Sequence, residues 1–435
     1  MKRRAFLAAA VAVSVLIPLT PGGHAADQDD QASALCLSCH SSLTPGIVGD
    51  WQRSKHSQSG VGCVACHGGE GKERKDVQEH YGERIVVLVT PKVCGECHPK
   101  ESKQFSESHH ARAAQFIGSL DNVLGEIVGG PPAVDVGCRQ CHGSTIKVLP
   151  NGKLDPTTWP NTGMGRVNPD GTRGSCSACH ARHAFSVAQA RQPEECGRCH
   201  MGPDHPQLEI YNESKHGVLY RANREHMNLD RPGGEWRPAR DHAYPTCSTC
   251  HMGPTATQPL THDVGTRISW TLRPPISTKL EHAEARRASM TEVCGNCHSP
   301  GFVGNFYQQY DSLVILYNEK FAAPATSIMA QLSAERLVTP TPFDDKIEWT
   351  YYLLWHHEGR RARHGAAMSG PDYAWWHGLF EVANRFYNEF LPEAEHLKPG
   401  ISQPVLDSDL HRWRKGVSRE ETQRILDFYR DRYAQ

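Results

Sequence analysis

Every cysteine in this chain of 435 residues belongs to a Cys-x-x-Cys-His motif; there are eight such motifs, and no cysteine is left over. Two thiols three positions apart can bond to the two vinyl groups of one porphyrin, and the adjacent histidine can then bind its iron. A disulfide framework would not require a histidine after every second cysteine. Zinc ribbons use Cys-x-x-Cys pairs in twos, with four ligands for each metal. The motifs therefore predict eight covalently attached haems c.

The motifs, numbered one to eight in chain order, name the residues that hold these haems. The predicted thioether cysteines are Cys36, Cys39, Cys63, Cys66, Cys94, Cys97, Cys138, Cys141, Cys176, Cys179, Cys196, Cys199, Cys247, Cys250, Cys294 and Cys297. The predicted proximal iron ligands are His40, His67, His98, His142, His180, His200, His251 and His298.

Composition limits what can fill the interior and what can bind outside. Only 38% of the residues are hydrophobic, a small supply for a core of this length, so we expect haems to form much of the core. The formal net charge is −1, whereas a protein that binds nucleic acid presents a basic face to the phosphates. The chain is therefore expected to bind a small substrate and redox partners, and no nucleic acid.

The N-terminus has the features of an export signal. Three basic residues (2–4) precede the apolar segment 5–19, and residues 23–25 offer a small-residue cleavage site. An uncleaved membrane anchor is the alternative, although the apolar run is short for a bilayer span. We therefore expect a signal peptide over residues 1–26 and an exported protein, periplasmic or otherwise, that is soluble once the signal is removed.

The rest of the chain divides at about residue 300. Residues 27–300 carry all eight motifs with Pro and Gly between them, which predicts a loop-rich octahaem-binding domain. Residues 301–435 contain no cysteine, and their patterning predicts a helical C-terminal domain. The expected fold class is therefore mainly α: a multihaem cytochrome c with a haem-filled core, a loop-rich N-terminal part and a helical C-terminal domain.

Several helices can be placed within the C-terminal domain. Apolar residues at spacings of three and four predict one helix face, formed by Phe302, Phe306, Tyr310, Leu313, Leu316, Tyr317 and Phe321. Segments 349–367 and 375–390 look like further helices, separated by Gly370 and Pro371. Ser418, with Glu421 three residues on, is a capping-box signature for a last helix.

Histidines outside the motifs are numerous enough to supply distal ligands. The chain has 26 histidines; eight are proximal and His24 lies in the leader, so seventeen remain. An electron-transfer protein with two histidines on every iron would use eight of them. An enzyme that binds substrate at one iron would use seven, and the count permits both.

An internal repeat points to particular distal ligands. The pattern aromatic-x-x-Ser-x-His occurs three times, ending at His56, His110 and His216. The aromatic residue could stack on a porphyrin while the histidine reaches an iron. Solvent-exposed histidines are the alternative, since such residues are common in any chain.

Longer blocks carry a family resemblance. From Trp355 to Gly378 the chain reads Trp-His-His-Glu-Gly-Arg-Arg-Ala-Arg-His-Gly-Ala-Ala-Met-Ser-Gly-Pro-Asp-Tyr-Ala-Trp-Trp-His-Gly. This block resembles the hydroxylamine oxidoreductase family of octahaem c-type cytochromes, as do segments 179–186, 202–207, 241–247 and 261–270. The resemblance runs from about residue 36 to the C-terminus.

The resemblance implies seven haems with two histidine ligands each and a fourth haem, on Cys138, Cys141 and His142, without a distal protein ligand. It also implies a homotrimer. Together with the repeat and with spacing, it predicts seven distal ligands: His56, His80, His110, His183, His205, His216 and His262. If His109 rather than His110 is the ligand, the repeat has been placed in the wrong register.

The open iron would bind a small inorganic nitrogen compound. The resemblance places an Asp-His pair over it, which Asp241 and His242 match, and histidine can relay protons near neutral pH. A buried salt bridge beside the seventh motif is the alternative for this pair. The expected function is hydroxylamine or hydrazine oxidation, with a partner cytochrome or quinone-linked protein taking the electrons.

One residue would decide the direction of the reaction. Family members that oxidise hydroxylamine have a tyrosine of a neighbouring subunit cross-linked to the fourth haem, and Tyr373 is the candidate here. Members without the cross-link look like nitrite reducers, and an aromatic helix-capping residue is the structural alternative for Tyr373. Nitrite or hydroxylamine reduction and pure electron transfer therefore remain alternative functions.

Overall fold

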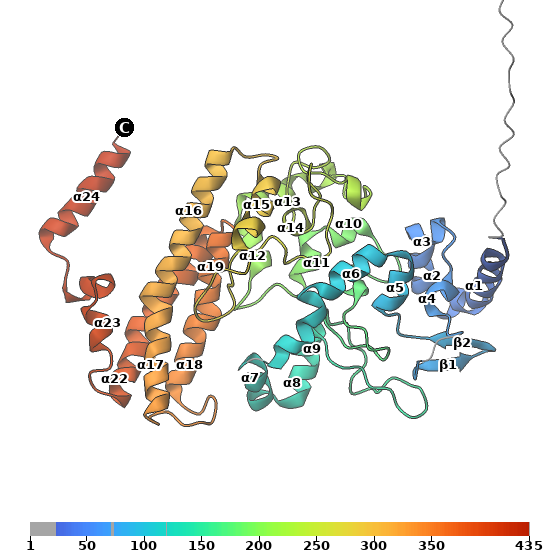
Figure 1. Cartoon of the computed structure of the whole chain (residues 1–435), viewed down its shortest axis with the longest axis horizontal. Coiled ribbons are helices and arrows are strands. Elements are labelled where there is room, and N and C mark those ends of the chain that lie inside the picture. The colour runs from blue at the N-terminus through green and yellow to red at the C-terminus, as the bar shows by residue number, and fades with distance from the viewer. Residues whose placement is uncertain (1–22, 71–73, 119, 435) are drawn as a thin grey trace, which may run out of the picture.

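The computed structural model describes residues 23–70, 74–118 and 120–434, and it is mainly helical (Figure 1). The molecule is elongated, with the N-terminal elements at one end and the last helices at the other. Most of the predicted signal peptide, residues 1–22, lies outside the described residues. Within the described part, no helix combines the length and the hydrophobicity that a bilayer crossing requires.

Short helices and one hairpin form the N-terminal end. The elements are α1 (Gly23–Leu43), α2 (Pro45–Gln52), α3 (Lys55–Gln58), α4 (Cys63–His67), β1 (Val77–His80), β2 (Glu83–Val86), α5 (Pro91–Cys97) and α6 (Pro99–Glu107). The strands pair antiparallel, from Val77 opposite Val86 to His80 opposite Glu83. Tyr81 and Gly82 both have positive φ, as a tight two-residue hairpin turn requires.

The middle of the chain holds motifs four to eight. Its elements are η1 (His110–Gly118), α7 (Leu120–Val128), α8 (Gly130–Val136), α9 (Cys138–His142), η2 (Cys176–Ala178), α10 (Val187–Ala190), α11 (Pro193–Gly197), α12 (Gln207–Glu213), α13 (Lys215–Asn223), η3 (Arg224–His226), η4 (Gly233–Glu235), α14 (Cys247–His251) and α15 (Ala283–Cys294). Most motifs thus lie on or at the end of a short helix, which fixes the direction of the proximal histidine.

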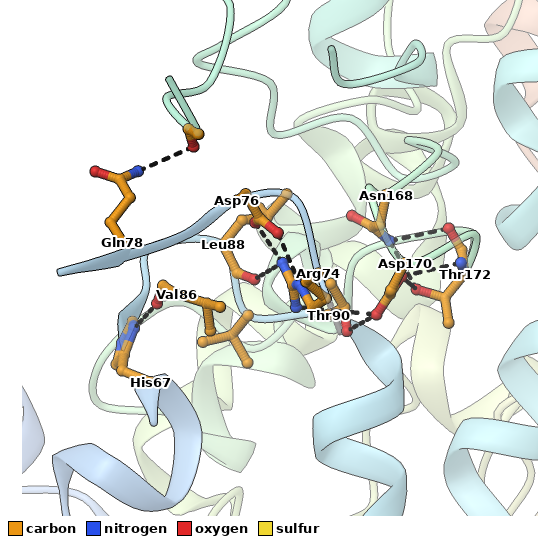
Figure 2. A network of polar contacts seen from close by, with 12 residues as sticks. His67, Arg74, Asp76, Gln78, Val86, Leu88, Thr90, Asn168, Asp170 and Thr172 are labelled. Atoms are coloured by element: carbon orange, nitrogen blue, oxygen red, sulfur yellow. Dashed lines mark hydrogen bonds and ion pairs between the residues drawn. The ribbon is translucent and has the colours of Figure 1, made fainter. Parts of the chain in front are cut away.

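A long irregular segment, 143–175, is held against the hairpin region by a polar network (Figure 2). Arg74 is buried and pairs with Asp76, with Nη2 2.5 Å from Oδ2, and also donates to the Leu88 carbonyl. Thr90 donates to Asp170 across this network at 2.5 Å, and Asn168 bonds the backbone of Thr172. The segment is therefore ordered by hydrogen bonds rather than by an apolar core.

Three long helical segments make the C-terminal bundle, and shorter elements follow it. The elements are α16 (Pro300–Tyr317), η5 (Asn318–Ala322), α17 (Ala323–Ala334), α18 (Lys346–Tyr352), η6 (Leu353–Gly359), α19 (Arg360–Ala367), α20 (Pro371–Ala374), η7 (Trp375–Phe380), α21 (Glu381–Arg385), η8 (Phe386–Phe390), α22 (Leu391–Leu397), α23 (Gln403–Asp407), η9 (Asp409–Lys415) and α24 (Arg419–Tyr433). The capping box of Ser418 and Glu421 at the start of α24 is confirmed.

The largest apolar core lies in this bundle. All of its buried members fall between Tyr317 and Ile401, whereas the motif-bearing part contributes only small clusters such as the one around Trp236. This distribution agrees with the prediction that another filler occupies the interior between the motifs. Figure 1 shows the bundle helices running side by side.

The buried face of α16 agrees in part with the predicted one. Tyr310, Tyr317 and Phe321 are buried as predicted, and Val303 and Val314 are buried as well, whereas Phe302 is 60% exposed. Phe302 instead stacks on the ring of His298, with ring centres 4.7 Å apart, so it faces the eighth motif rather than the bundle. The apolar spacing alone could not separate these two faces.

Candidate haem sites and the Asp204–His205 cluster

Five proximal histidines face a second histidine across a nearly constant gap. The ring centres of each pair lie 6.1 or 6.2 Å apart. The pairs are His40 with His80 at the first motif, His67 with His183 at the second, His98 with His56 at the third, His200 with His110 at the sixth and His298 with His216 at the eighth.

This gap fits a haem iron. Two imidazoles bound on opposite sides of one iron, with metal–nitrogen bonds of about 2 Å, have ring centres roughly 6 Å apart. A direct hydrogen bond between the rings would bring their nitrogens to about 3 Å and the ring centres closer together. The residues present therefore fit haem, and each pair would supply its proximal and distal ligands.

The repeat owes its fixed spacing to helix capping. Ser54, Ser108 and Ser214 are buried, and each accepts a hydrogen bond from a backbone N–H three residues later, at 3.1, 3.5 and 3.2 Å respectively. The histidine two positions after each serine is thereby held in the first turn of a helix. All three of these histidines belong to the pairs above, so the repeat acts as a ligand-positioning unit.

At the sixth motif two histidines compete for one position. His110 and His205 both have ring centres 6.1 Å from that of His200. Both nitrogens of His205 already face oxygen atoms: Nδ1 lies 2.5 Å from Oδ1 of Asp204, and Nε2 lies 2.9 Å from the Cys199 carbonyl. An iron ligand needs a free lone pair, so the geometry favours His110 over the predicted His205.

Burial also suits His110 and His200 to iron binding. It lowers the pKa of His110 to about 4 and that of His200 to about 3, so both rings are neutral at pH 7. Neutral imidazole is the form that binds a metal.

At the fourth, fifth and seventh motifs, other contacts describe the surroundings of the proximal histidine. His262 lies within electrostatic range of His180 at the fifth motif. At the seventh motif His251 bonds the Val264 carbonyl through Nδ1 at 3.2 Å and has His110 in electrostatic range. At the fourth motif Nδ1 of His142 lies 3.3 Å from the Ala113 carbonyl. These Nδ1 contacts leave Nε2 to face an iron.

The thiols reveal which sites are neighbours. Thiols of different motifs lie close enough to affect each other's pKa at Cys36 with Cys63, Cys94 with Cys176, Cys141 with Cys199 and Cys196 with Cys247. Electrostatic contacts link Cys179 to Cys196 and Cys250 to Cys294. Motifs three, five, six, seven and eight therefore form one continuous row, and motif four branches from motif six.

A buried polar cluster lies where this branch meets the bundle. Asp204 bonds His205 on one side, and on the other it accepts a hydrogen bond from Arg360 at 2.9 Å. The same guanidinium lies 2.8 Å from Nε2 of His356, which is 3.3 Å from the Tyr352 hydroxyl. His205 is also within electrostatic range of Cys141, so the cluster adjoins the fourth motif.

Charge within the cluster favours the protonated form of His205. Burial works against ionisation of both groups, but the hydrogen bond from His205, together with His356 and Arg360, holds the pKa of Asp204 well below its usual range. Burial likewise disfavours a charged His205, yet Asp204 raises the pKa of His205. The pair can therefore hold a proton near the fourth motif.

Asp241 and His242 lie in a different environment. Asp241 is paired with Arg240 at 2.7 Å and Arg231 at 3.2 Å. His242 is buried and stacks on Trp236 with ring centres 3.9 Å apart, and burial lowers its pKa to about 4. The surroundings of the pair are thus formed by segment 231–242 and by Arg191, whose guanidinium lies 4.4 Å from the centre of the Trp236 ring. The Asp-His dipeptide also occurs at Asp204-His205, which is the signal in the sequence that could have drawn attention to the second pair.

Tyr373 is half-buried on α20. Its backbone N–H lies 3.4 Å from Oε1 of Glu213 on α12, and its ring centre is 5.7 Å from that of His377. It therefore lies within a short helix that begins at Pro371, and its side chain is neither fully exposed nor fully buried. Trp375 and Trp376, just beyond it, are more than half exposed.

Comparisons with known proteins agree with haem binding. Residues 163–341 match a family model described as seven times multi-haem cytochrome CxxCH, and residues 21–68 and 93–125 match cytochrome c554 and c-prime. The chain is 27% identical over 369 residues to a probable nitrite reductase-hydroxylamine oxidoreductase fusion protein of Kuenenia stuttgartiensis. That match covers 71% of this chain but only 38% of the relative.

Two solved structures have a similar fold. A hypothetical multiheme protein superposes with a TM-score of 0.74 at 24% identity and covers 87% of this chain and 98% of its own. The Kuenenia stuttgartiensis reducing HAO-like protein complex gives a TM-score of 0.64 at 23% identity, with 89% and 90% covered. The fold is thus that of multihaem proteins, and the matched families are cytochromes c with covalently bound haem.

Proposed function

We propose that this multihaem cytochrome c carries eight haems and is an oxidoreductase that acts on a small inorganic nitrogen compound at the fourth. The observation that carries the proposal is the Asp204–His205 pair, which adjoins Cys141 of the fourth motif. The Kuenenia relative, named for both nitrite reduction and hydroxylamine oxidation, supports this substrate class.

An open haem iron would bind the nitrogen atom and exchange electrons with it. Residues of the chain would transfer protons to and from the substrate. His205 carries a proton at Nε2 that it can give to a substrate being reduced, or it can take one back when a substrate is oxidised. Asp204 stabilises the protonated ring, while Arg360 fixes the position of Asp204.

The row of motifs would disperse the electrons. The branch from motif four to motif six joins the site to motifs three, five, seven and eight. For the haems at motifs one, two, three, five, six and eight we assign the distal ligands, in that order, to His80, His183, His56, His262, His110 and His216. His205 and the predicted pair Asp241–His242 remain competing candidates, the former for a ligand and the latter for the acid–base role.

The direction of catalysis depends on Tyr373. Oxidation of hydroxylamine or hydrazine requires that it reach the fourth haem of an adjacent subunit, whereas nitrite reduction does not. A homotrimer is supported by exposed apolar side chains, among them Trp375, Trp376 and Phe380 near Tyr373. The enzyme would work after export and pass electrons to or from a partner cytochrome or quinone-linked protein.

Ligand binding by the holoprotein tests the proposal, with nitric oxide for the reduced form and cyanide for the oxidised form. Nitric oxide or cyanide should bind one haem per chain, and Asp204→Asn should slow turnover of hydroxylamine or nitrite without loss of haem. A chain in which no haem binds either ligand would be a pure electron-transfer cytochrome, and the proposal would then fail.

A further inference from the structure

Arg166 is a buried cation whose hydrogen bonds all go to neutral groups. Its side chain and backbone together are 2% exposed. Nε donates to the Asn168 amide oxygen at 2.8 Å, Nη1 to the Asn161 carbonyl at 3.3 Å and Nη2 to the Val89 carbonyl at 3.0 Å. Burying a charge without a counter-ion is costly, so such a residue calls for an explanation.

A nearby arginine provides the contrast. The side chain of Arg74 is also buried, but it pairs with Asp76 and has Asp170 3.9 Å away (Figure 2). Its charge is therefore neutralised within the network. Among the contacts described for Arg166, by comparison, no carboxylate appears, and Arg182 and Arg74 lie within electrostatic range. Arg166 thus adds one positive charge to this part of the interior, and its described hydrogen bonds go to no carboxylate.

The backbone around Arg166 is fixed to the fourth motif. Met164 and Gly165 donate their N–H groups to the carbonyls of Cys141 and His142, at 2.8 and 3.0 Å. Gly143, which follows His142 with a φ of 86°, packs so closely on the Arg166 backbone that no side chain would fit there. The position of Arg166 is therefore set by the same segment that holds the fourth haem site.

From this anchor the guanidinium reaches the third and fifth motifs. The Val89 carbonyl, to which Nη2 donates at 3.0 Å, lies just before the helix that carries Cys94. The Arg166 carbonyl accepts a hydrogen bond at 2.7 Å from the N–H of Gly174, which lies shortly before Cys176. The charge of Arg166 also acts on both thiols. Burial lowers the pKa of Arg166 to about 10, so the residue stays charged at neutral pH. A permanent positive charge thus stands beside the point where two haem sites meet.

We propose that Arg166 raises the reduction potentials of the haems at the third and fifth motifs. Reduction adds one negative charge to a haem, and a fixed cation in a poorly screened interior favours the reduced form. The two haems would then collect electrons next to the fourth site. This inference rests on haem occupancy of the motifs, but not on the nitrogen substrate or on the direction of catalysis.

Spectroelectrochemical titration of the purified holoprotein tests it. Arg166→Met should shift one or two of the haem midpoints to lower potential. A three- to tenfold change in the reduction equilibrium is expected, about 28 to 59 mV for a one-electron couple. Arg166→Lys retains the charge and should leave the midpoints near those of the wild type. Haem content, from the pyridine haemochrome, must stay the same in each variant.

Arg363→Met is the matched control. Arg363 is fully buried and also bonds neutral groups, among them the Pro274 carbonyl and the Ser277 hydroxyl, but it lies in the bundle. Its replacement should move no midpoint. If Arg166→Met fails to load haem, the midpoints of Arg166→Gln and Asn168→Asp test the proposal instead. Asn168→Asp places a carboxylate beside Nε of Arg166 and so neutralises its charge.

Unchanged midpoints in a loaded Arg166→Met or Arg166→Gln variant would overturn the proposal. So would loss of haem in all three charge-altering variants, because Arg166 would then serve folding alone. Failure of nitrogen turnover with a shifted midpoint would instead count against the proposed enzyme activity and leave this inference standing.

Discussion

Arg360 on α19 donates a hydrogen bond to Oδ2 of Asp204 at 2.9 Å and thereby joins the C-terminal bundle to the segment that follows the sixth motif. Asp204 uses its other oxygen for His205, so the carboxylate is fixed from both sides. A proton-handling group gains from such fixation because its geometry need not be reorganised during the reaction.

Replacing Asp204 and Asp241 in turn should show which of the two Asp-His pairs acts as the acid–base group. We expect Asp204→Asn to lower turnover by roughly 10²- to 10⁴-fold, the usual contribution of an acid–base group, with haem content unchanged. Asp241→Asn should change turnover by less than about threefold, because Asp241 is already engaged by Arg231 and Arg240. Steady-state rates with hydroxylamine and with nitrite measure both. A larger loss of turnover in Asp241→Asn than in Asp204→Asn would instead assign the acid–base role to Asp241 and His242.

Loss of a distal ligand should be visible in the spin state of one haem. His110→Ala is expected to convert one low-spin haem to high spin, because the ring facing His200 is removed. His205→Ala should leave the low-spin count unchanged and serves as the control at the same motif. Electron paramagnetic resonance of the oxidised protein counts the haems. A conversion in His205→Ala, or in His109→Ala but not in His110→Ala, would contradict the assignment.

The mass of the mature chain tests the cofactor content. Since all sixteen cysteines lie in attachment motifs, we expect eight thioether-bound haems and no free thiol. Intact-mass spectrometry should give the apo-chain, cut near residue 26, plus eight haems, and thiol titration should find none reactive. Six or fewer haems, or zinc in place of iron, would refute the central sequence inference.

A cross-link from Tyr373 should survive denaturation. If the enzyme oxidises hydroxylamine, chains should remain joined in a reducing denaturing gel, and Tyr373→Phe should release monomers that keep their thioether haems. Tyr373 is only half-buried and packs beside Glu213, so its replacement should not unfold the chain. Wild-type chains that already separate cleanly in denaturant would point to the nitrite-reducing direction.

A buried carboxyl group should make stability depend on pH. Burial raises the pKa of Glu358 to about 7, against 4.5 ordinarily, and Arg385 offsets this only in part. The folded state then holds its proton more tightly than the unfolded state, so the free energy of unfolding falls as pH rises from about 4.5 to about 7. The loss attributable to this group is roughly 3 kcal/mol, at about 1.36 kcal/mol per pKa unit.

Chemical denaturation followed by circular dichroism measures this dependence. Glu358→Gln should flatten it between pH 5 and 7. Glu389→Gln removes the other carboxylate bonded to Arg385, but that side chain is 42% exposed and should leave the pH dependence as in the wild type. Equal slopes in the wild type and in Glu358→Gln would show that Glu358 is not the titrating group.

Sequence patterns predicted local features well and spatial neighbours poorly. The class of the fold followed from the motifs, and the start of the last helix followed from Ser418 and Glu421, because both depend on residues a few positions apart. The repeat ending at His56, His110 and His216 selected three histidines that each face a motif histidine. Capping by a buried serine explains why spacing sufficed there.

Features that could not be predicted from the sequence depend on contacts between distant segments. His205 fits the spacing of a distal ligand, yet only the structure brings Arg360 to Asp204 and a carbonyl to Nε2 of His205. The burial of Arg166 is likewise invisible in the sequence, since its partners lie on three separate segments. The exposure of Phe302 could not be read from apolar periodicity, because a haem face and a bundle face look alike in sequence.

The location of the large apolar core has a consequence for how the chain matures. Its buried residues come from one contiguous stretch, from Tyr317 to Ile401, so they can meet without closing long loops. Among the residues that the structure describes, the motif-bearing part has no comparable core, so we expect it to become compact only when its haems are attached. The bundle is therefore expected to assemble independently, while residues 27–300 stay open to the machinery that forms the thioether bonds.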